Sequence, residues 1–139
     1  MIWLIAEDDT DILSLVATMT KVWGHTPLTF SNGQQVWDWL DKVDEGTEAA
    51  KLPEFALMDI RMPGKKGNEL ARRIRRTSGL QHIPIALMTA FMLSEAEQNV
   101  MRRQDGVDRI IAKPLPEFQQ LFGLLTGIIE EKRSGAQQG

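Results

Sequence analysis

The chain has 139 residues, with 16 basic against 19 acidic side chains and a formal net charge of −3 at pH 7. This length suits one domain with a self-supporting core, and the acidic balance disfavours a direct nucleic-acid partner. The absence of cysteine excludes disulfides, thiolate metal sites and cysteine nucleophiles. The stretch Met1–Ala6 has no basic lead and ends in three acids, so we expect neither a signal peptide nor a membrane span. These features predict a cytoplasmic domain with no membrane partner.

Short apolar runs alternate with longer stretches whose apolar residues stand three and four positions apart. The five runs are Ile2–Ala6, Pro27–Phe30, Phe55–Met58, Pro84–Met88 and Ile110–Ala112. The spacing after each run predicts a helix, with Ser31 as the N-cap of the second helix and Ser94 as that of the fourth. Strands that alternate with helices in this way predict a doubly wound α/β fold, in which helices cover both faces of a five-stranded parallel sheet.

Polar side chains with related chemistry follow four of the five predicted strands. They are Glu7, Asp8 and Asp9 after the first, Asp59 after the third, Thr89 after the fourth and Lys113 after the fifth. Ligands of doubly wound sheets bind outside the carboxyl ends of the strands, so we expect these side chains to share one site. Carboxylates that lie close together repel, and one takes up a proton unless a cation intervenes. Oxygen ligands without cysteine or a suitably spaced histidine favour a hard divalent ion such as Mg²⁺.

This set of groups has the chemistry of a phosphoryl-transfer site. With the ion bound, one carboxylate can remain ionised and act as a nucleophile. The ion and the Lys113 ammonium can share the charge of an incoming phosphoryl group, and the Thr89 hydroxyl can donate its proton to a phosphoryl oxygen.

Four motifs together resemble the receiver domain of bacterial two-component response regulators. They are Glu7-Asp8-Asp9, Asp59-Ile-Arg-Met-Pro-Gly-Lys-Lys-Gly, Met88-Thr89-Ala90 and Lys113-Pro114. The resemblance covers about residues 2 to 132 and implies a flavodoxin-like sheet with the strand order 2-1-3-4-5. It also implies a receiver domain over residues 1–132, and we expect a polar tail or linker stub over 133–139.

The resemblance assigns a role to each acid. Asp59 matches the phosphoacceptor and a metal ligand, Asp8 matches a direct Mg²⁺ ligand, and Glu7 matches the acid that holds a metal-bound water. Arg61 stands where the family uses a backbone carbonyl as a ligand. If the first strand ran one residue longer, Asp8 and Asp9 would be the metal-binding pair instead.

The remaining site positions show one departure from the family. Thr89 matches the switch hydroxyl and Lys113 the phosphate-binding lysine, whose bond to Pro114 is usually cis in these proteins. Three residues before the lysine the family commonly has an aromatic residue, but this chain has Ile110. We therefore expect its output to depend more on movement of the loop Ala90–Leu93.

The resemblance implies a signalling protein that catalyses its own aspartyl phosphorylation and dephosphorylation. Its partners would be a sensor histidine kinase or phosphotransfer protein, and a downstream effector protein or a second copy that binds the output surface near Ser94–Lys132. The alternative is a receiver-fold scaffold that acts by binding proteins without being phosphorylated. A haloacid-dehalogenase-type phosphatase is disfavoured because Arg61 stands where its second aspartate would be. A flavodoxin-like carrier is disfavoured because three acids would repel a flavin phosphate.

Two further features concern the surface. Arg61 and Phe91 stand two residues after Asp59 and Thr89, on the rim that water must cross, so we hypothesise slow autodephosphorylation. A basic stretch lies on and before the third predicted helix, and we interpret it as a solvated face. Its members are Arg61, Lys65, Lys66, Arg72, Arg73, Arg75 and Arg76.

Overall fold

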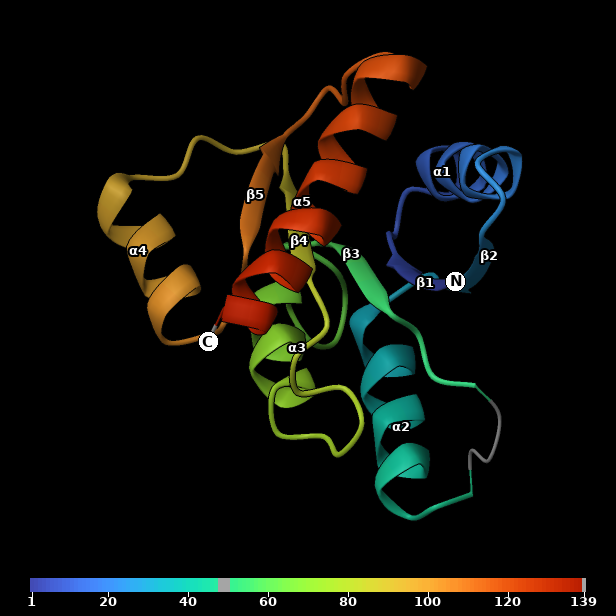
Figure 1. Cartoon of the computed structure of the whole chain (residues 1–139), viewed down its shortest axis with the longest axis vertical. Helices are drawn as coiled ribbons and strands as arrows, with labels where there is room; N and C mark the ends of the chain where they lie inside the picture. The colour runs from blue at the N-terminus through green and yellow to red at the C-terminus, as the bar shows by residue number, and fades with distance from the viewer. Residues whose placement is uncertain (48–50, 139) are drawn as a thin grey trace.

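The computed structural model describes residues 1–47 and 51–138. Five strands alternate with five helices along the described chain (Figure 1). The elements are β1 Ile2–Ala6, α1 Thr10–Val22, β2 Thr26–Phe30, α2 Gly33–Asp44, β3 Phe55–Asp59, α3 Gly67–Ile74, β4 Ile85–Thr89, α4 Glu95–Arg103, β5 Arg109–Ala112 and α5 Phe118–Gln138. The strands form a parallel sheet in the order β2-β1-β3-β4-β5, which confirms the predicted fold class and strand order.

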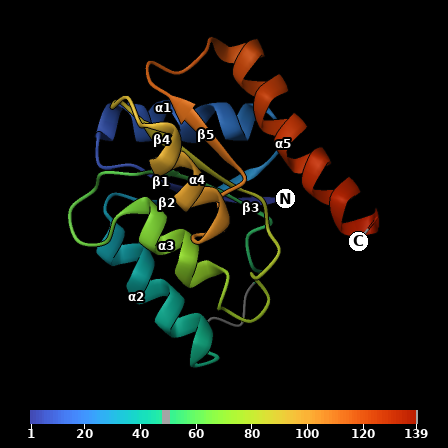
Figure 2. The ribbon, with the colours of Figure 1, turned by 90° about the vertical axis from the view of Figure 1, so that its left-hand side faces the viewer.

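The core consists of two apolar layers, one on each face of the sheet. Side chains alternate across a strand, so Leu4 and Ala6 of β1 contribute to one layer, whereas Trp3 and Ile5 contribute to the other. The first layer packs against α2 and α3, and the second packs against α1 and α5. In Figure 2, α2, α3 and α4 lie in front of the sheet. Every residue of β3 and β4 is buried, which explains why these two runs are apolar almost throughout.

The register of the sheet aligns the carboxyl ends of the inner strands. Ala6 at the end of β1 pairs with Met58, and Thr89 at the end of β4 pairs with Ala112. The polar residues that follow these positions are therefore brought to one edge of the sheet, as the sequence predicts.

One of the two predicted helix caps is correct and the other is displaced by one residue. Ser94 caps α4, because its Oγ accepts a hydrogen bond from the backbone N–H of Glu97 at 3.1 Å. At α2 the cap is Asn32, whose Oδ1 accepts from the backbone N–H of Gln35 at 2.8 Å. Ser31 lies one residue earlier and donates its backbone N–H to Gln35 Oε1 instead. The expectation of Ser31 as the cap is wrong because Asn32 is the last extended residue before the helix.

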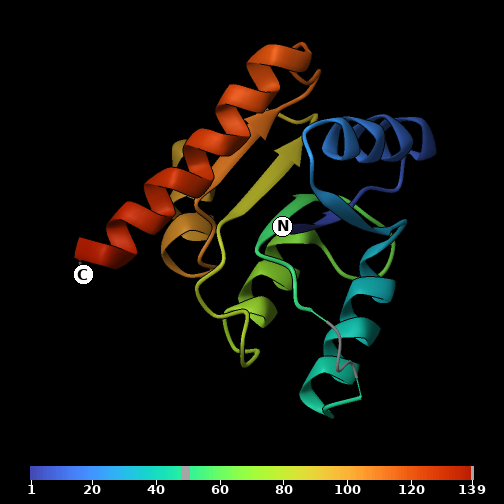
Figure 3. The ribbon, with the colours of Figure 1, turned by 45° about the vertical axis from the view of Figure 1, so that its right-hand side comes forward.

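The last helix is longer than the apolar stripe in its sequence suggests. Residues 133–138, expected as a polar tail, continue α5 as a helix to Gln138. Figure 3 shows α5 alongside β5. Ion pairs hold the turn of α5 that precedes this segment, with Lys132 Nζ 2.9 Å from Asp108 Oδ1 and Arg109 Nη2 3.2 Å from Glu131 Oε2. None of the helices in the described residues is long and apolar enough to cross a membrane.

The basic stretch on α3 is more than a solvated face. Three of its arginines make ion pairs with acids from other segments: Arg72 with Asp105, Arg73 with Asp41 and Asp44, and Arg75 with Asp108. The Arg73 and Arg75 side chains are only 15% and 18% exposed. The interpretation as a solvated face is therefore wrong for Arg73 and Arg75, whereas Arg72 is 49% exposed although it is ion-paired. The ion pairs were not visible as a local pattern because the partners lie about 30 residues away in sequence.

Two glycines at helical positions predict opposite effects of alanine. At Gly67, which begins α3, an added Cβ would overlap the Asp59 carbonyl oxygen, whereas an added Cβ at Gly123 in α5 would have no atom within 4 Å apart from the neighbouring backbone of its own helix. We expect Gly67→Ala to lower the free energy of unfolding by about 2–3 kcal/mol through overpacking. Gly123→Ala should raise it by about 0.5–1 kcal/mol because alanine favours the helix. Urea denaturation of both variants measures this difference, and changes of equal sign would contradict the packing argument.

Candidate active site

Three carboxylates converge at the edge of the sheet where β1 and β3 end. Glu7, Asp8 and Asp59 each offer one oxygen, and these oxygens all lie within 4.8 Å of one another. Glu7 directly follows β1 and is 1% exposed, Asp59 is the last residue of β3 and is 7% exposed, and Asp8 is exposed. The structure thus brings together the three acids that the sequence predicted as metal ligands.

Asp9 does not belong to this cluster. Its Oδ1 accepts hydrogen bonds from the backbone N–H groups of Asp11 and Ile12 at 3.0 and 3.2 Å, so it caps α1. Because β1 ends at Ala6, the geometry favours Glu7 and Asp8 over the alternative pair of Asp8 and Asp9.

Lys113 supplies the positive charge at this site. Its Nζ lies 2.7 Å from Glu7 Oε1 and 3.5 Å from Asp59 Oδ1. The residue follows β5, and its backbone N–H donates to the Thr89 carbonyl oxygen at 2.7 Å, which fixes the chain beside the end of β4. The bond from Lys113 to Pro114 is cis, as the family resemblance implies.

Burial and like charges set the titration of the site. Burial, together with the nearby carboxylate of Glu7, raises the pKa of Asp59 to about 7, although Lys113 acts in the opposite direction. Burial acts to lower the pKa of Lys113, but Glu7 and Asp59 outweigh it, so this pKa lies above its usual value. Near neutral pH the site therefore holds a lysine that is protonated and an aspartate that competes for a proton.

The donor set fits a hard divalent cation. Three carboxylates face a single ammonium, which leaves negative charge uncompensated. The buried Glu7 Oε2 has no hydrogen-bond partner among the residues that the structure describes, and a buried oxygen of this kind needs a donor, a water or an ion. Oxygen ligands without thiolate or imidazole are those that Mg²⁺ prefers. Ligation by the backbone carbonyl of Arg61 stays a prediction.

Thr89 lies at the end of β4, where its side chain is buried. Its Oγ1 accepts a hydrogen bond from the backbone N–H of Phe91 at 3.0 Å and donates to the Phe91 carbonyl oxygen at 3.3 Å. The hydroxyl is therefore engaged with the loop between β4 and α4. A hydroxyl has a single proton, so donation to a group at the carboxylates requires Thr89 to give up its hydrogen bond to the Phe91 carbonyl oxygen.

Arg61 and Phe91 form a contact that the sequence analysis did not foresee. The Arg61 guanidinium carbon lies 3.8 Å from the centroid of the Phe91 ring, a cation–π geometry. Sequence reasoning placed both residues on the rim of the site but gave no sign that they touch. The contact joins the segment after β3 to the segment after β4.

Ile110, at the position where the family commonly has an aromatic residue, is half-buried in β5. It packs against the apolar layer beneath α2 and α3. The expectation that the loop Ala90–Leu93 carries the output change stays a prediction.

A doubly wound sheet with an acidic triad and a lysine at its strand ends defines a receiver-type α/β protein. A family model described as the response regulator receiver domain matches residues 3–125. The chain therefore belongs to the response regulator receiver domain family, and its class is that of two-component signalling proteins.

Two relatives illustrate the match. The chain is 30% identical over 132 residues to the phosphate regulon transcriptional regulatory protein PhoB of Pseudomonas aeruginosa, covering 95% of this chain and 53% of PhoB. It is 29% identical over 117 residues to the polar-differentiation response regulator DivK of Brucella anthropi, covering 83% of this chain and 87% of DivK. The chain thus spans about half the length of PhoB and most of that of DivK.

Solved structures share the fold. A CheY-like receiver domain protein from Methanospirillum hungatei superposes with a TM-score of 0.75 at 21% identity, covering 96% of this chain and 97% of that one. The receiver domain of a sensor histidine kinase from Pseudomonas aeruginosa has a TM-score of 0.74 at 23% identity, covering 93% and 97%. That domain was solved with a magnesium ion coordinated in its active-site cleft.

The raised pKa of Asp59 predicts a defined pH dependence of stability without divalent ions. The folded carboxyl, with a pKa of about 7, keeps its proton to higher pH than the unfolded one, whose pKa is 3.8, so stability falls as the pH rises between these values. We expect Asp59→Asn to be more stable than the parent protein at pH 8 by about 2 kcal/mol, and the difference to shrink toward pH 4. Urea denaturation across this range measures the effect.

Asp9→Asn is the matched control, because asparagine also caps helices and Asp9 lies outside the cluster. Parallel stability profiles for the parent protein and Asp59→Asn would show that Asp59 does not titrate as described.

Proposed function

We propose that this chain is the phosphoacceptor receiver domain of a two-component response regulator. In this proposal Asp59 takes a phosphoryl group from the phosphohistidine of a sensor histidine kinase or phosphotransfer protein. The observation that carries the proposal is the buried Asp59 carboxylate, 3.5 Å from Lys113 Nζ and within one cluster with Glu7 and Asp8. A carboxylate in this setting can act as a nucleophile once its proton is displaced.

The acids provide the place for a cation. Glu7, Asp8 and Asp59, with the backbone carbonyl of Arg61, would hold Mg²⁺. When bound, Mg²⁺ supplies positive charge that keeps Asp59 ionised and offsets the charge of phosphoryl oxygens. The magnesium in the related receiver domain of the Pseudomonas aeruginosa kinase supports this choice of ion.

The transfer itself exchanges one bond for another. An Asp59 carboxylate oxygen forms a bond to phosphorus while the bond from phosphorus to the histidine nitrogen breaks, and the electron pair of that bond returns to the imidazole. Lys113 holds an ammonium beside Asp59, where it stabilises negative charge on the transferred group. The chain thus catalyses its own phosphorylation. Water later attacks the phosphorus of the acyl phosphate and breaks its bond to the Asp59 oxygen, which releases inorganic phosphate and restores the carboxylate.

In this proposal, Thr89 links phosphorylation of Asp59 to a change at the protein surface. To donate to a phosphoryl oxygen, the Thr89 hydroxyl must give up its hydrogen bond to the Phe91 carbonyl oxygen, which changes the hydrogen bonding of the loop Ala90–Leu93. The change would reach the surface near Ser94–Lys132. There an effector protein or a second copy of the chain would bind. The interaction with a histidine kinase is implied by membership of the receiver domain family.

Phosphorylation with a small-molecule donor tests the central claim. We expect incubation with acetyl phosphate and Mg²⁺ to add one phosphoryl group by intact mass. Asp59→Asn should remove the addition because the nucleophile is lost, and omission of Mg²⁺ should suppress it. Asp9→Asn should leave the addition intact because Asp9 caps α1 outside the cluster.

Failure of the parent protein to be labelled, under conditions that label another receiver domain, would contradict the proposal. That outcome would favour the alternative of a receiver-fold scaffold that acts by binding alone.

The contact of Arg61 with Phe91 predicts slow loss of the phosphoryl group. The two side chains lie together on the rim that an attacking water must cross. We expect the double variant Arg61→Ala, Phe91→Ala to lose its phosphoryl group severalfold faster than the parent protein, followed by intact mass after removal of the donor. Lys66→Ala is a control at an exposed residue of the same loop. Equal rates of phosphoryl loss in the parent protein and the double variant would refute the idea that Arg61 and Phe91 obstruct the attacking water.

A further inference from the structure

The loop between β3 and α3, which carries the Arg61 carbonyl, is tied to the domain at both of its ends. At its start the backbone N–H of Ile60 donates to the Met88 carbonyl oxygen at 2.9 Å, which extends the pairing of β3 with β4. At its end the backbone N–H of Gly67 donates to the Ile60 carbonyl oxygen at 2.9 Å, which closes the loop. These bonds leave the position of residues 61–66 to other contacts.

Side-chain contacts hold the first part of this loop. The Met62 side chain is buried in the apolar layer that packs against α2 and α3. The Arg61 guanidinium lies over the half-exposed Phe91 ring. Residues 63–65 are held differently, because they contact the backbone at the start of α2.

Gly33, the first residue of α2, is buried against this second part of the loop. Its backbone N–H donates to the Pro63 carbonyl oxygen at 3.0 Å. A Cβ added at Gly33 would overlap the Lys65 carbonyl oxygen and lie 2.8 Å from the Lys65 backbone nitrogen. Only glycine fits at this position, because any side chain would have to displace the backbone of the loop.

The loop approaches α2 through a glycine of its own. Gly64 has a φ of +83°, a conformation that side-chain-bearing residues rarely adopt. A Cβ added there would lie 2.8 Å from the backbone nitrogen of Gln34 and 2.9 Å from the Gln34 Cβ. The next residue, Lys65, places its Nζ 4.5 Å from the centroid of the Trp37 ring of α2. The loop and the helix are therefore in close contact along residues 63–65.

The start of α2 is a firm support for the loop. The Asn32 Oδ1 accepts from the backbone N–H of Gln35 at 2.8 Å, and the Gln35 Oε1 accepts from the backbone N–H of Ser31 at 2.9 Å. Further along the helix, Val36 and Leu40 are fully buried in the core. These contacts fix the helix without the loop, so a conflict at their contact displaces the loop more than the helix.

We propose that Gly33 is a positioning residue for the Mg²⁺ site, because the start of α2 holds residues 63–65 of the loop and thereby sets the position of the Arg61 carbonyl. The inference rests on the proposed function, in which this carbonyl is a metal ligand. Asp59 belongs to β3, so it keeps its place when the loop shifts. Loss of the contact at Gly33 therefore weakens the binding of Mg²⁺ and leaves the nucleophile intact.

Binding of Mg²⁺ to the unphosphorylated chain, measured by isothermal titration calorimetry, tests this role. We expect Gly33→Ala to raise the dissociation constant for Mg²⁺ about tenfold, the size of loss that follows removal of a contact that orients a metal ligand. Gly64→Ala should raise this constant in the same way, because it disturbs the same contact from the side of the loop. If Gly33→Ala does not fold, Gly64→Ala decides the question, since Gly64 is exposed.

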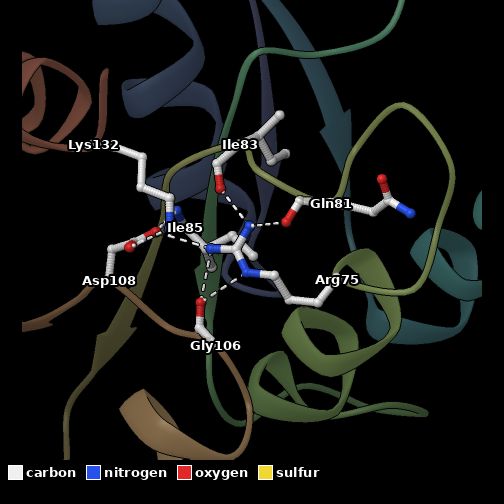
Figure 4. A network of polar contacts seen from close by, with 7 residues as sticks. All are labelled: Arg75, Gln81, Ile83, Ile85, Gly106, Asp108 and Lys132. Atoms are coloured by element: carbon white, nitrogen blue, oxygen red, sulfur yellow. Dashed lines mark hydrogen bonds and ion pairs between the residues drawn. The ribbon is translucent and has the colours of Figure 1, made fainter. Parts of the chain in front are cut away.

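Gly106→Ala is the matched control at the opposite end of the sheet. Gly106 also has a positive φ, of +76°, and a Cβ added there would lie 2.8 Å from Cγ and Nε of Arg75. Figure 4 shows that Arg75 side chain, which donates to the carbonyl oxygens of Gly106, Gln81 and Ile83 and to the carboxylate of Asp108. We expect Gly106→Ala to lower the free energy of unfolding in urea. It should leave the dissociation constant for Mg²⁺ unchanged, because these acceptors lie before β4 and β5, away from the loop.

Rescue by excess Mg²⁺ separates a positioning role from damage to the nucleophile. We expect acetyl phosphate to label Gly33→Ala and Gly64→Ala more slowly than the parent chain at limiting Mg²⁺, and at nearly the parent rate at saturating Mg²⁺, as followed by intact mass. Labelling that stays slow at saturating Mg²⁺ would contradict the proposed role.

The binding measurements also distinguish failure of this inference from failure of the proposed function. Unchanged Mg²⁺ affinity in either folded variant, or an equal loss of affinity in Gly106→Ala, would overturn the role of Gly33 while the proposed function stood. A parent chain that binds no Mg²⁺ would instead overturn the metal site of the proposed function, and this inference with it.

Discussion

Repulsion among Glu7, Asp8 and Asp59 is the constraint on which the site depends. The sheet register forces their oxygens to within 4.8 Å, and burial prevents water from screening the charges of Glu7 and Asp59. Lys113 offsets part of this repulsion, and the remainder appears as the raised pKa of Asp59. The same imbalance that destabilises the charged site favours a divalent cation and, through it, a group with anionic oxygens. The repulsion among these carboxylates therefore both lowers the stability of the protein and creates the site that can bind a cation.

The two ends of the sheet are held by different kinds of interaction. At the carboxyl ends, the buried ion pair of Lys113 with Glu7 joins the segments after β5 and β1. Around the loop after β4, the contacts are that between Arg61 and the half-exposed Phe91 ring and the two hydrogen bonds of Thr89. At the amino ends of β4 and β5, Arg75 and Asp108 form a dense network of hydrogen bonds. Polar contacts between segments are therefore denser where β4 and β5 begin than around the loop Ala90–Leu93.

The sequence predicted the residues of the site correctly because they lie at the ends of strands, which apolar runs mark. Glu7, Asp59 and Lys113 each follow an apolar run, so the rule for parallel sheets was enough to place them together. The same reasoning failed for Arg75, whose partners include Gly106 and Asp108, because nothing in the sequence around this residue, which directly follows α3, marks a pairing about 30 residues away. It also placed the cap of α2 on Ser31 instead of Asn32, since either residue type can cap a helix.

The sequence by itself determined the class of fold, the order of its elements and the identity of the acids that meet at the sheet edge. These follow from periodicity and from residue type at strand ends, which are local properties of the chain. The tertiary structure decided that Asp9 caps a helix instead of joining the cluster, that Arg61 lies over Phe91 and that α3 holds the exit of α4. Such contacts depend on how helices and loops are placed across the sheet, and distances between segments far apart in the chain are fixed only when the whole core packs.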